Sequence, residues 1–121
     1  MFDHVALNVS NEKKSREFYE KALKPLGYSV VATFENWTGF GTGEKPEFWI
    51  ARRDATSKGA HIAFAAADRK SVDAFHKAAV GAGGKDNGKP GIRADYSPTY
   101  YGAFVFDPDG NNIEAVCYKA E

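Results

Sequence analysis

Short runs in which apolar and polar side chains alternate occur at the start of the chain and again near its middle. Residues 2–9 and residues 61–67 both follow this period of two, which is typical of a half-buried strand. Each run is followed by a polar residue that can cap a helix, Asn11 in the first case and Asp68 in the second. Apolar residues then recur at steps of three or four, as in Phe18, Ala22 and Leu26. This pattern predicts that an amphipathic helix follows each strand.

The two strand-helix segments are related by an internal repeat with an offset of 57 residues. At this offset His4 aligns with His61, and the closing glycine Gly27 aligns with Gly84. A shared histidine and helix-ending glycine indicate a duplicated supersecondary unit rather than two unrelated segments. We therefore expect one domain of two modules, residues 1–57 and residues 58–121.

Three further strands are expected in the first module, at residues 28–35, 37–41 and 47–53. In the second module, residues 101–106 and 111–118 read as strands joined by a tight turn at residues 107–111. Residues 85–98 are polar and glycine-rich and are expected to form a long loop, in place of a clear strand. The predicted class is α+β, with two βαβββ modules that form a curved mixed sheet with the helices outside.

Three side chains of metal-ligand type occupy matching places in these modules. Strand alternation places His4 and His61 on the face of their strands that points away from the helix, and Glu114 on a strand face with Asn112 and Val116. Each alone could be an exposed or hydrogen-bonded strand residue. Together, two imidazoles and one carboxylate could bind a divalent ion such as Fe, Mn, Ni or Zn and leave positions open for substrate.

These histidines, this glutamate and the segment that runs from Asp107 to Glu114 resemble the vicinal oxygen chelate superfamily, which contains glyoxalase I, fosfomycin-resistance enzymes, bleomycin-resistance proteins and extradiol dioxygenases. The resemblance covers nearly the whole chain. It implies that His4, His61 and Glu114 are metal ligands, and that metal-bound oxygens of a small molecule with vicinal oxygens are activated in a lyase, transferase or dioxygenase type of reaction.

The chain departs from this family at a fourth ligand position, which falls among Phe48, Trp49 and Ile50. Glyoxalase I has there a glutamate that is both ligand and proton-transfer base, so the departure argues against glyoxalase I isomerisation. The superfamily also includes proteins that sequester a ligand without metal or catalysis. In that alternative, aromatic residues such as Trp37 and Trp49 would stack on the ligand.

Further residues are candidates for the wall of the site. Arg93 and Tyr96 are the candidates for catalytic contacts, because they lie in the expected loop beside the second module's open face. Other aromatic or basic candidates carry less weight, since strand aromatics more often belong to the core or to an interface. These are Trp37, Trp49, Arg52, Tyr100 and Tyr101.

Composition narrows the classes of partner. Sixteen Lys plus Arg balance sixteen Asp plus Glu, so no net positive charge attracts nucleic acid or anionic lipid. The single cysteine, Cys117, cannot form an internal disulfide, and charged residues near the N-terminus are unlike a signal peptide. We expect a cytoplasmic protein with a small-molecule substrate. A homodimer is also expected, because two short modules bury little core and open sheets need covered edges.

Overall fold

The computed structural model describes residues 2–120, and in this range the chain forms eight strands, two α-helices and one short 3-10 helix. The elements of the first module are β1 (Val5–Val9), α1 (Glu12–Leu23), η1 (Lys24–Leu26), β2 (Ser29–Phe34), β3 (Trp37–Gly41) and β4 (Phe48–Arg52). Those of the second module are β5 (His61–Ala65), α2 (Arg69–Gly81), β6 (Lys85–Ile92), β7 (Tyr101–Phe106) and β8 (Asn112–Cys117). The order β-α-β-β-β thus occurs twice, as the predicted fold class requires, and β6 is the strand that the local pattern of the second module did not predict.

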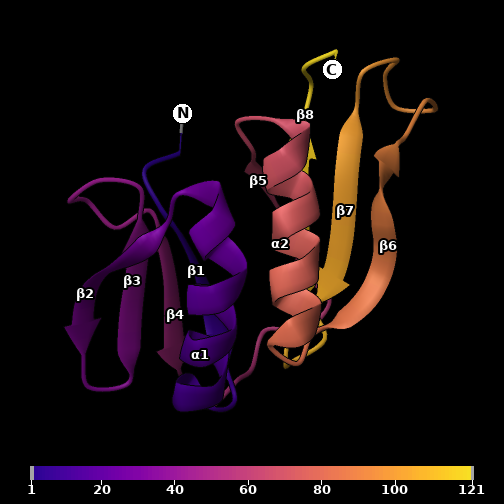
Figure 1. Cartoon of the computed structure of the whole chain (residues 1–121). Coiled ribbons are helices and arrows are strands. Elements are labelled where there is room, and N and C mark those ends of the chain that lie inside the picture. Colours follow the sequence, from indigo (N-terminus) through magenta and orange to yellow (C-terminus); the bar gives the residue numbers. More distant parts are fainter. Residues whose placement is uncertain (1, 121) are drawn as a thin grey trace.

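Each module forms its own four-stranded sheet, and both sheets have the same topology. The strand orders are β1-β4-β3-β2 and β5-β8-β7-β6, so the first and last strands of each module lie side by side (Figure 1). These two strands are parallel, whereas the other neighbours are antiparallel. The predicted α+β class with two βαβββ modules is confirmed, and the strands divide between two mixed sheets.

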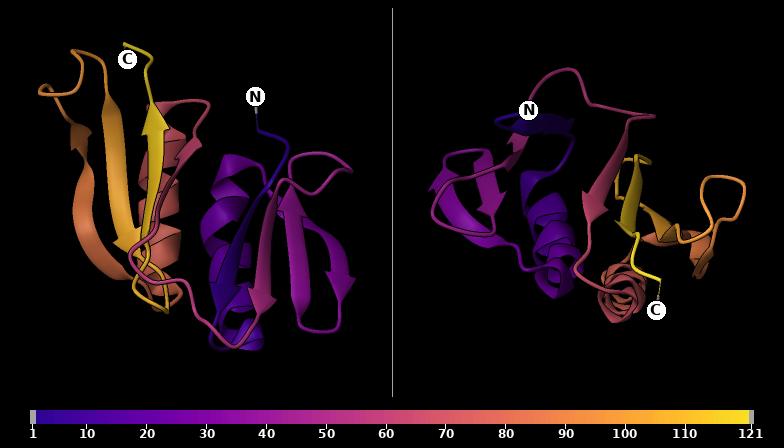
Figure 2. Two further views of the ribbon diagram at one scale, coloured as in Figure 1. Left: turned by 180° about the vertical axis from the view of Figure 1, so that it is seen from behind. Right: turned by 90° about the horizontal axis from the view of Figure 1, so that it is seen from above.

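The two helices lie next to each other, and each covers one face of its own sheet (Figures 1 and 2). Both begin at the predicted caps, where Asn11 Oδ1 accepts a hydrogen bond from the Lys14 N–H at 3.0 Å and Asp68 Oδ1 accepts one from the Ser71 N–H at 2.8 Å. In the part of the chain that the structure describes, no helix is long and apolar enough to cross a membrane.

One cluster of buried apolar side chains contains residues of both modules. The rings of Phe48 and Phe64 meet edge to face with centroids 5.3 Å apart, which joins β4 to β5. A polar contact also crosses the module boundary, because the buried hydroxyl of Tyr19 donates to Asp107 Oδ2 at 2.5 Å. Burial and the adjacent Asp107 carboxylate raise the pKa of Tyr19 well above its usual value. The helix sides of both sheets therefore share a continuous interior.

The prediction of a long loop at residues 85–98 is wrong for its first part. Residues Lys85–Ile92 form β6, which pairs with β7 through register shifts between Asp86 and Gly88 and between Gly88 and Gly91. An edge strand tolerates such bulges, and it also tolerates Pro90, because one side of the strand needs no hydrogen-bond partner. The bulges interrupt the alternation by which strands are recognised in sequence, and the loop is restricted to residues 93–100.

Candidate functional site

The face of the second sheet that points away from α2 collects the chemically active side chains of the module. Ala63 of β5 is in register with Glu114 of β8, and Phe104 of β7 lies opposite Glu114. His61 is two residues before Ala63, so it shares this face. The left view of Figure 2 shows both sheets from the side opposite the helices, where no helix or strand of residues 2–120 covers them. We call this side the open face of each sheet.

Glu114 is a buried carboxylate whose two oxygens are both engaged on the open face. Its side chain is 1% exposed, and Oε1 lies 2.8 Å from Nε2 of His61. The other oxygen, Oε2, accepts a hydrogen bond from the Tyr100 hydroxyl. The His61 side chain is 52% exposed, so the pair reaches from the interior to the surface. A buried carboxylate needs such partners, because an unpaired buried charge is costly.

The Tyr100 side chain is held in place by aromatic neighbours. Its ring meets those of Tyr96 and Tyr118 edge to face, with centroid distances of 4.9 and 5.2 Å. Burial, followed by the hydrogen bond to Glu114 and the charge of that carboxylate, raises the pKa of Tyr100 above its usual value. The phenol therefore remains a hydrogen-bond donor at neutral pH.

A glycine makes room for this contact. A Cβ placed on Gly102 would lie 3.2 Å from Oε2 of Glu114 and 3.1 Å from Cε1 of Tyr100. Carbon atoms rarely approach other heavy atoms this closely, so any larger residue would push the two side chains apart. The absence of a side chain at Gly102 allows the phenol to reach the carboxylate across β7.

His4, the third predicted ligand, lies elsewhere in the chain. It precedes β1 at the surface of the first module, where its Nδ1 is 2.7 Å from Asp3 Oδ1. Hydrogen bonds from Lys45 and His4 hold the pKa of Asp3 below its usual value. No group of three or more His, Cys, Asp or Glu side chains with the spacing of a metal site occurs within residues 2–120. The chain brings His61 and Glu114 together and leaves His4 on the other sheet, because the modules form separate sheets.

The strand register identifies the residue of the first module that corresponds to Glu114. Ala6 corresponds to Ala63 at the repeat offset, and Ala6 is in register with Trp49, as Ala63 is with Glu114. An indole therefore occupies the position of the fourth ligand. Among the residues that the sequence left open there, Trp49 is the one on the open face.

Trp49 is part of an aromatic cluster on the open face of the first sheet, which consists of Phe34, Trp37 and Trp49. The rings of Phe34 and Trp49 are stacked with centroids 6.2 Å apart, and Trp37 meets Trp49 edge to face at 6.0 Å. The guanidinium of Arg53 lies 4.5 Å from the centre of a Trp37 ring. Phe34 is 68% exposed, so a broad apolar surface faces outward.

The two predicted catalytic residues lie near Glu114 without touching it. Tyr96 is exposed and packs on Tyr100. The guanidinium of Arg93 donates to the carbonyl oxygens of Gly91 and Lys89 and lies 5.3 Å from the ring centre of Phe104, which in turn is 6.1 Å from the His61 ring. Arg93 is thus placed at the rim of the open face.

Tyr100 and Tyr101 were both only candidates for the wall, and the structure separates them. The Tyr101 hydroxyl donates to Asp73 of α2, on the helix side of the sheet, at 2.6 Å. Tyr100 makes the direct contact with Glu114, which the sequence reasoning missed. The available signal was the alternation of Tyr100, Gly102 and Phe104 along one face of the strand opposite Glu114.

The separation of His61 and Glu114 is compatible with a shared divalent ion. Neighbouring ligands that are each about 2.1 Å from an ion lie about 3 Å apart when the angle between them is near 90°. The observed 2.8 Å between Nε2 and Oε1 is close to this value. A nitrogen and a carboxylate oxygen also form a donor set that suits Zn, Mn, Fe or Ni.

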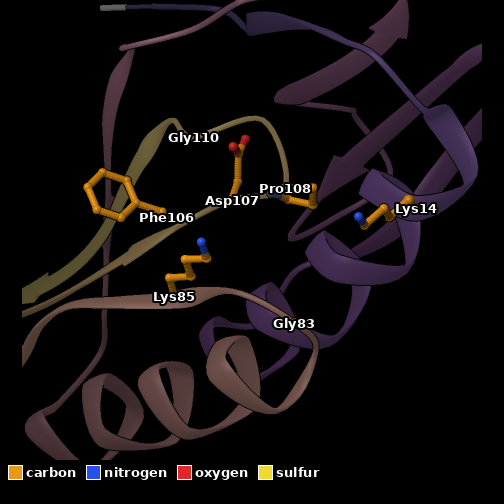
Figure 3. A pocket seen from close by; sticks show the side chains of 7 residues that line it. All are labelled: Lys14, Gly83, Lys85, Phe106, Asp107, Pro108 and Gly110. Carbon is orange, nitrogen blue, oxygen red and sulfur yellow. The ribbon is translucent and has the colours of Figure 1, made fainter.

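A cavity near the module junction is separate from this pair. Its volume is about 480 Å³, and it is bordered by Lys14 of α1, by Gly83 and Lys85 after α2, and by the turn between β7 and β8 (Figure 3). His61, Glu114 and Tyr100 are not among its lining residues. The ligand-type residues therefore occupy an open sheet face rather than a closed cavity.

Both the sequence and the fold of this chain match a known protein family. The sequence profile of the Glyoxalase/Bleomycin resistance protein/Dioxygenase superfamily matches residues 1–115. No match to a curated protein was found. A crystal structure of a glyoxalase/bleomycin resistance protein from Albidiferax ferrireducens T118 is 29% identical, with a TM-score of 0.86 over 98% of this chain and 99% of the other.

More distant structures share the fold. A glyoxalase-related enzyme from Fulvimarina pelagi is 16% identical with a TM-score of 0.76, over 97% of this chain and 87% of the other. A glyoxalase/bleomycin resistance protein/dioxygenase family enzyme from Burkholderia phytofirmans PsJN is 14% identical with a TM-score of 0.75, over 97% and 98% of the two chains. On the evidence of the profile match, the duplicated βαβββ modules and these structures, the chain belongs to the glyoxalase/bleomycin resistance protein/dioxygenase superfamily.

Proposed function

We propose that the protein is a metal-dependent enzyme that acts on a small molecule with vicinal oxygens at the open face of the second sheet. The observation that carries this proposal is the buried Glu114 carboxylate, which faces away from α2 and is joined to the exposed imidazole of His61 at 2.8 Å. Because the His61 side chain is exposed, an ion could reach the pair from solvent. The reaction would be of the lyase, transferase or dioxygenase type.

His61 and Glu114 would hold the ion, which when bound would polarise an oxygen of the substrate as a Lewis acid. The carboxylate contributes negative charge, and the imidazole contributes a neutral nitrogen donor. Tyr100 donates to the second carboxylate oxygen. Arg93 at the rim can orient an anionic or polar part of the substrate, and the exposed phenol of Tyr96 can do the same.

His4 would be the third ligand, contributed by a second copy of the chain in a homodimer. In support, His4 is exposed and directly precedes β1, which is an edge strand of its sheet. His61 begins β5, the edge strand at the same place in the second sheet. An edge strand with free backbone groups can approach another chain closely.

Metal binding tests the proposal directly. Protein purified without chelator is titrated with Zn²⁺, Mn²⁺, Ni²⁺ and Fe²⁺ by calorimetry, and its metal content is measured by mass spectrometry. We expect one ion per chain in the wild type and a loss of affinity of at least about 100-fold in Glu114→Gln, because a neutral amide is a poor ligand.

The control is Asp86→Asn, which removes the carboxylate of a second His-carboxylate pair with the same 2.8 Å separation, His76 with Asp86. That pair lies between α2 and β6, away from the open face, and its loss should leave binding unchanged. A wild-type protein that neither contains nor binds any of these ions would exclude the metal-dependent proposal.

A second candidate is a metal-free protein that sequesters a small molecule, as bleomycin-resistance proteins do. The exposed aromatic cluster of Phe34, Trp37 and Trp49 favours it, because such rings stack on planar ligands. Quenching of tryptophan fluorescence by planar aromatic compounds measures this binding. For this candidate, Trp49→Ala should weaken binding at least tenfold, whereas His4→Ala and Glu114→Ala should leave it intact.

A further inference from the structure

We propose that Tyr100 is a positioning residue that fixes the Glu114 carboxylate with one oxygen turned toward His61. The inference rests on the proposed function, since it concerns the carboxylate assigned there as a metal ligand. Tyr100 itself would touch neither ion nor substrate.

Each of the two carboxylate oxygens of Glu114 has its own hydrogen-bond partner. Tyr100 engages Oε2, and Oε1 faces His61. Glutamate has three side-chain torsions, and freezing them on ligand binding costs entropy. A donor that already fixes the carboxylate removes part of this cost in advance. Hydrogen bonds to metal ligands generally change metal affinity by about 10- to 100-fold.

Tyr100 is itself built into a fixed frame. Its N–H donates to the Ser97 carbonyl at 3.2 Å, and its carbonyl accepts from the Arg93 N–H at 2.7 Å, so the turn at residues 93–100 closes on it. The rings of Tyr96 and Tyr118 pack on the phenol. These contacts therefore hold the Tyr100 hydroxyl beside Oε2 of Glu114.

Gly102 lies directly beneath the contact. A Cβ there would meet both Tyr100 and Glu114 at distances of 3.1 and 3.2 Å. The absence of a side chain at Gly102 thus leaves room for the phenol and the carboxylate to meet.

The neighbouring tyrosine supplies a matched control. Tyr101 also donates its hydroxyl to a carboxylate, Asp73 Oδ1 at 2.6 Å, but on the helix side of the same strand. Tyr100→Phe and Tyr101→Phe each remove one hydroxyl and one Tyr-carboxylate hydrogen bond. Only the first should affect the open face.

Cobalt binding is the first readout, because Co²⁺ substitutes for other divalent ions and its visible absorption reports the ligand arrangement. We expect Tyr100→Phe to weaken Co²⁺ binding by about 10- to 100-fold and to change the visible spectrum. Gly102→Ala should act in the same direction, whereas Tyr101→Phe should stay within twofold of the wild type. If wild type binds Co²⁺ and Tyr100→Phe binds it equally well with the same spectrum, the positioning role is excluded.

A readout on the metal-free protein separates this proposal from the proposed function. The ring N–H of His61 should be visible by ¹H–¹⁵N NMR in the wild type, because Glu114 accepts from it and slows its exchange with water. In Tyr100→Phe that signal should broaden or vanish, while Tyr101→Phe keeps it. If Tyr100→Phe loses the His61 signal but the wild type binds no metal, the metal site is excluded and the positioning role is retained. If the His61 signal is unchanged in Tyr100→Phe, the positioning role is excluded.

Discussion

Tyr19 and Asp107 form a buried polar contact between residues 88 positions apart in the sequence. Asp107 also accepts hydrogen bonds from the backbone N–H groups of Asp109 and Asn111, so its carboxylate organises the turn between β7 and β8. The contact thus ties α1 of the first module to the turn that leads into the Glu114 strand.

Removal of the Tyr19 hydroxyl should therefore destabilise the protein. We expect Tyr19→Phe to lower the free energy of unfolding by about 1.5–3 kcal/mol, because the lost hydrogen bond has a charged acceptor in a buried setting. Chemical denaturation followed by circular dichroism measures this. Tyr101→Phe, which removes an exposed Tyr-Asp hydrogen bond, should cost less than about 0.5 kcal/mol. If both variants lower the free energy of unfolding by the same amount, the buried Tyr19–Asp107 contact stabilises the fold no more than an exposed Tyr-Asp hydrogen bond.

The sequence predicted which residue types could form the site, but it predicted fewer of the contacts between their side chains. Alternation along a strand predicted the face of His61 and of Glu114, and the structure brings these two together. It could not predict that Tyr100 reaches Glu114, because that contact depends on strand register, on the loop before β7 and on the space at Gly102. The approach of His4 to the pair stays a prediction, since it depends on a second chain.

The two helices differ in the chemistry of their caps, although the modules are repeats. The α1 cap is Asn11, which does not titrate, whereas the α2 cap is Asp68. Hydrogen bonds from the Ser71 hydroxyl and from its N–H lower the pKa of Asp68 below the ordinary value of 3.8. Only the second helix should therefore have a cap that responds to acid.

The sign of this pH dependence follows from the lowered pKa. Because the folded pKa of Asp68 is below the unfolded one, its contribution to stability is complete above pH 3.8 and is lost as the pH falls through the folded pKa. Asp68→Asn keeps a capping oxygen but has no carboxyl to titrate. The melting temperature of Asp68→Asn should thus approach that of the wild type as the pH is lowered from neutral to about 3. A constant gap between the two proteins over this range would contradict the prediction.

Elements with a strong hydrophobic period were predictable, and the weakly patterned one was not. The strand-helix segment that begins each module keeps its alternation and its capping residue, so the duplication is visible in the amino-acid sequence itself. β6 contains Gly88, Pro90 and Gly91, and its pairing with β7 shifts register twice. Its formation depends on β7 as a template, which is tertiary information that a local pattern does not carry.

The open faces of both sheets expose apolar surface. Phe34 is 68% exposed on the first, and Tyr96 beside the second is 65% exposed. Burial of such surface would favour a homodimer. Light scattering should therefore give twice the mass of one chain.

A charge placed in this surface should separate the copies. We expect Phe34→Lys to shift the mass toward that of a single chain, since an unpaired buried charge is costly. Glu20→Lys, on the exposed side of α1, is the control and should remain a dimer. A dimer that persists in Phe34→Lys at micromolar concentration would mean that the open face of the first sheet is not the contact.

The presence of Trp49 where the second module has Glu114 makes the halves of the chain non-interchangeable, although their backbones match. A protein assembled from two copies of residues 58–121 would have a His-carboxylate pair in each half, and one assembled from two copies of residues 1–57 would have an indole at both places. The matching strand positions thus hold an aromatic side chain on one half and the acid on the other. Replacing one half by a copy of the other would therefore change the side chains of an open face, and it would also remove one partner of the Tyr19–Asp107 contact between the modules.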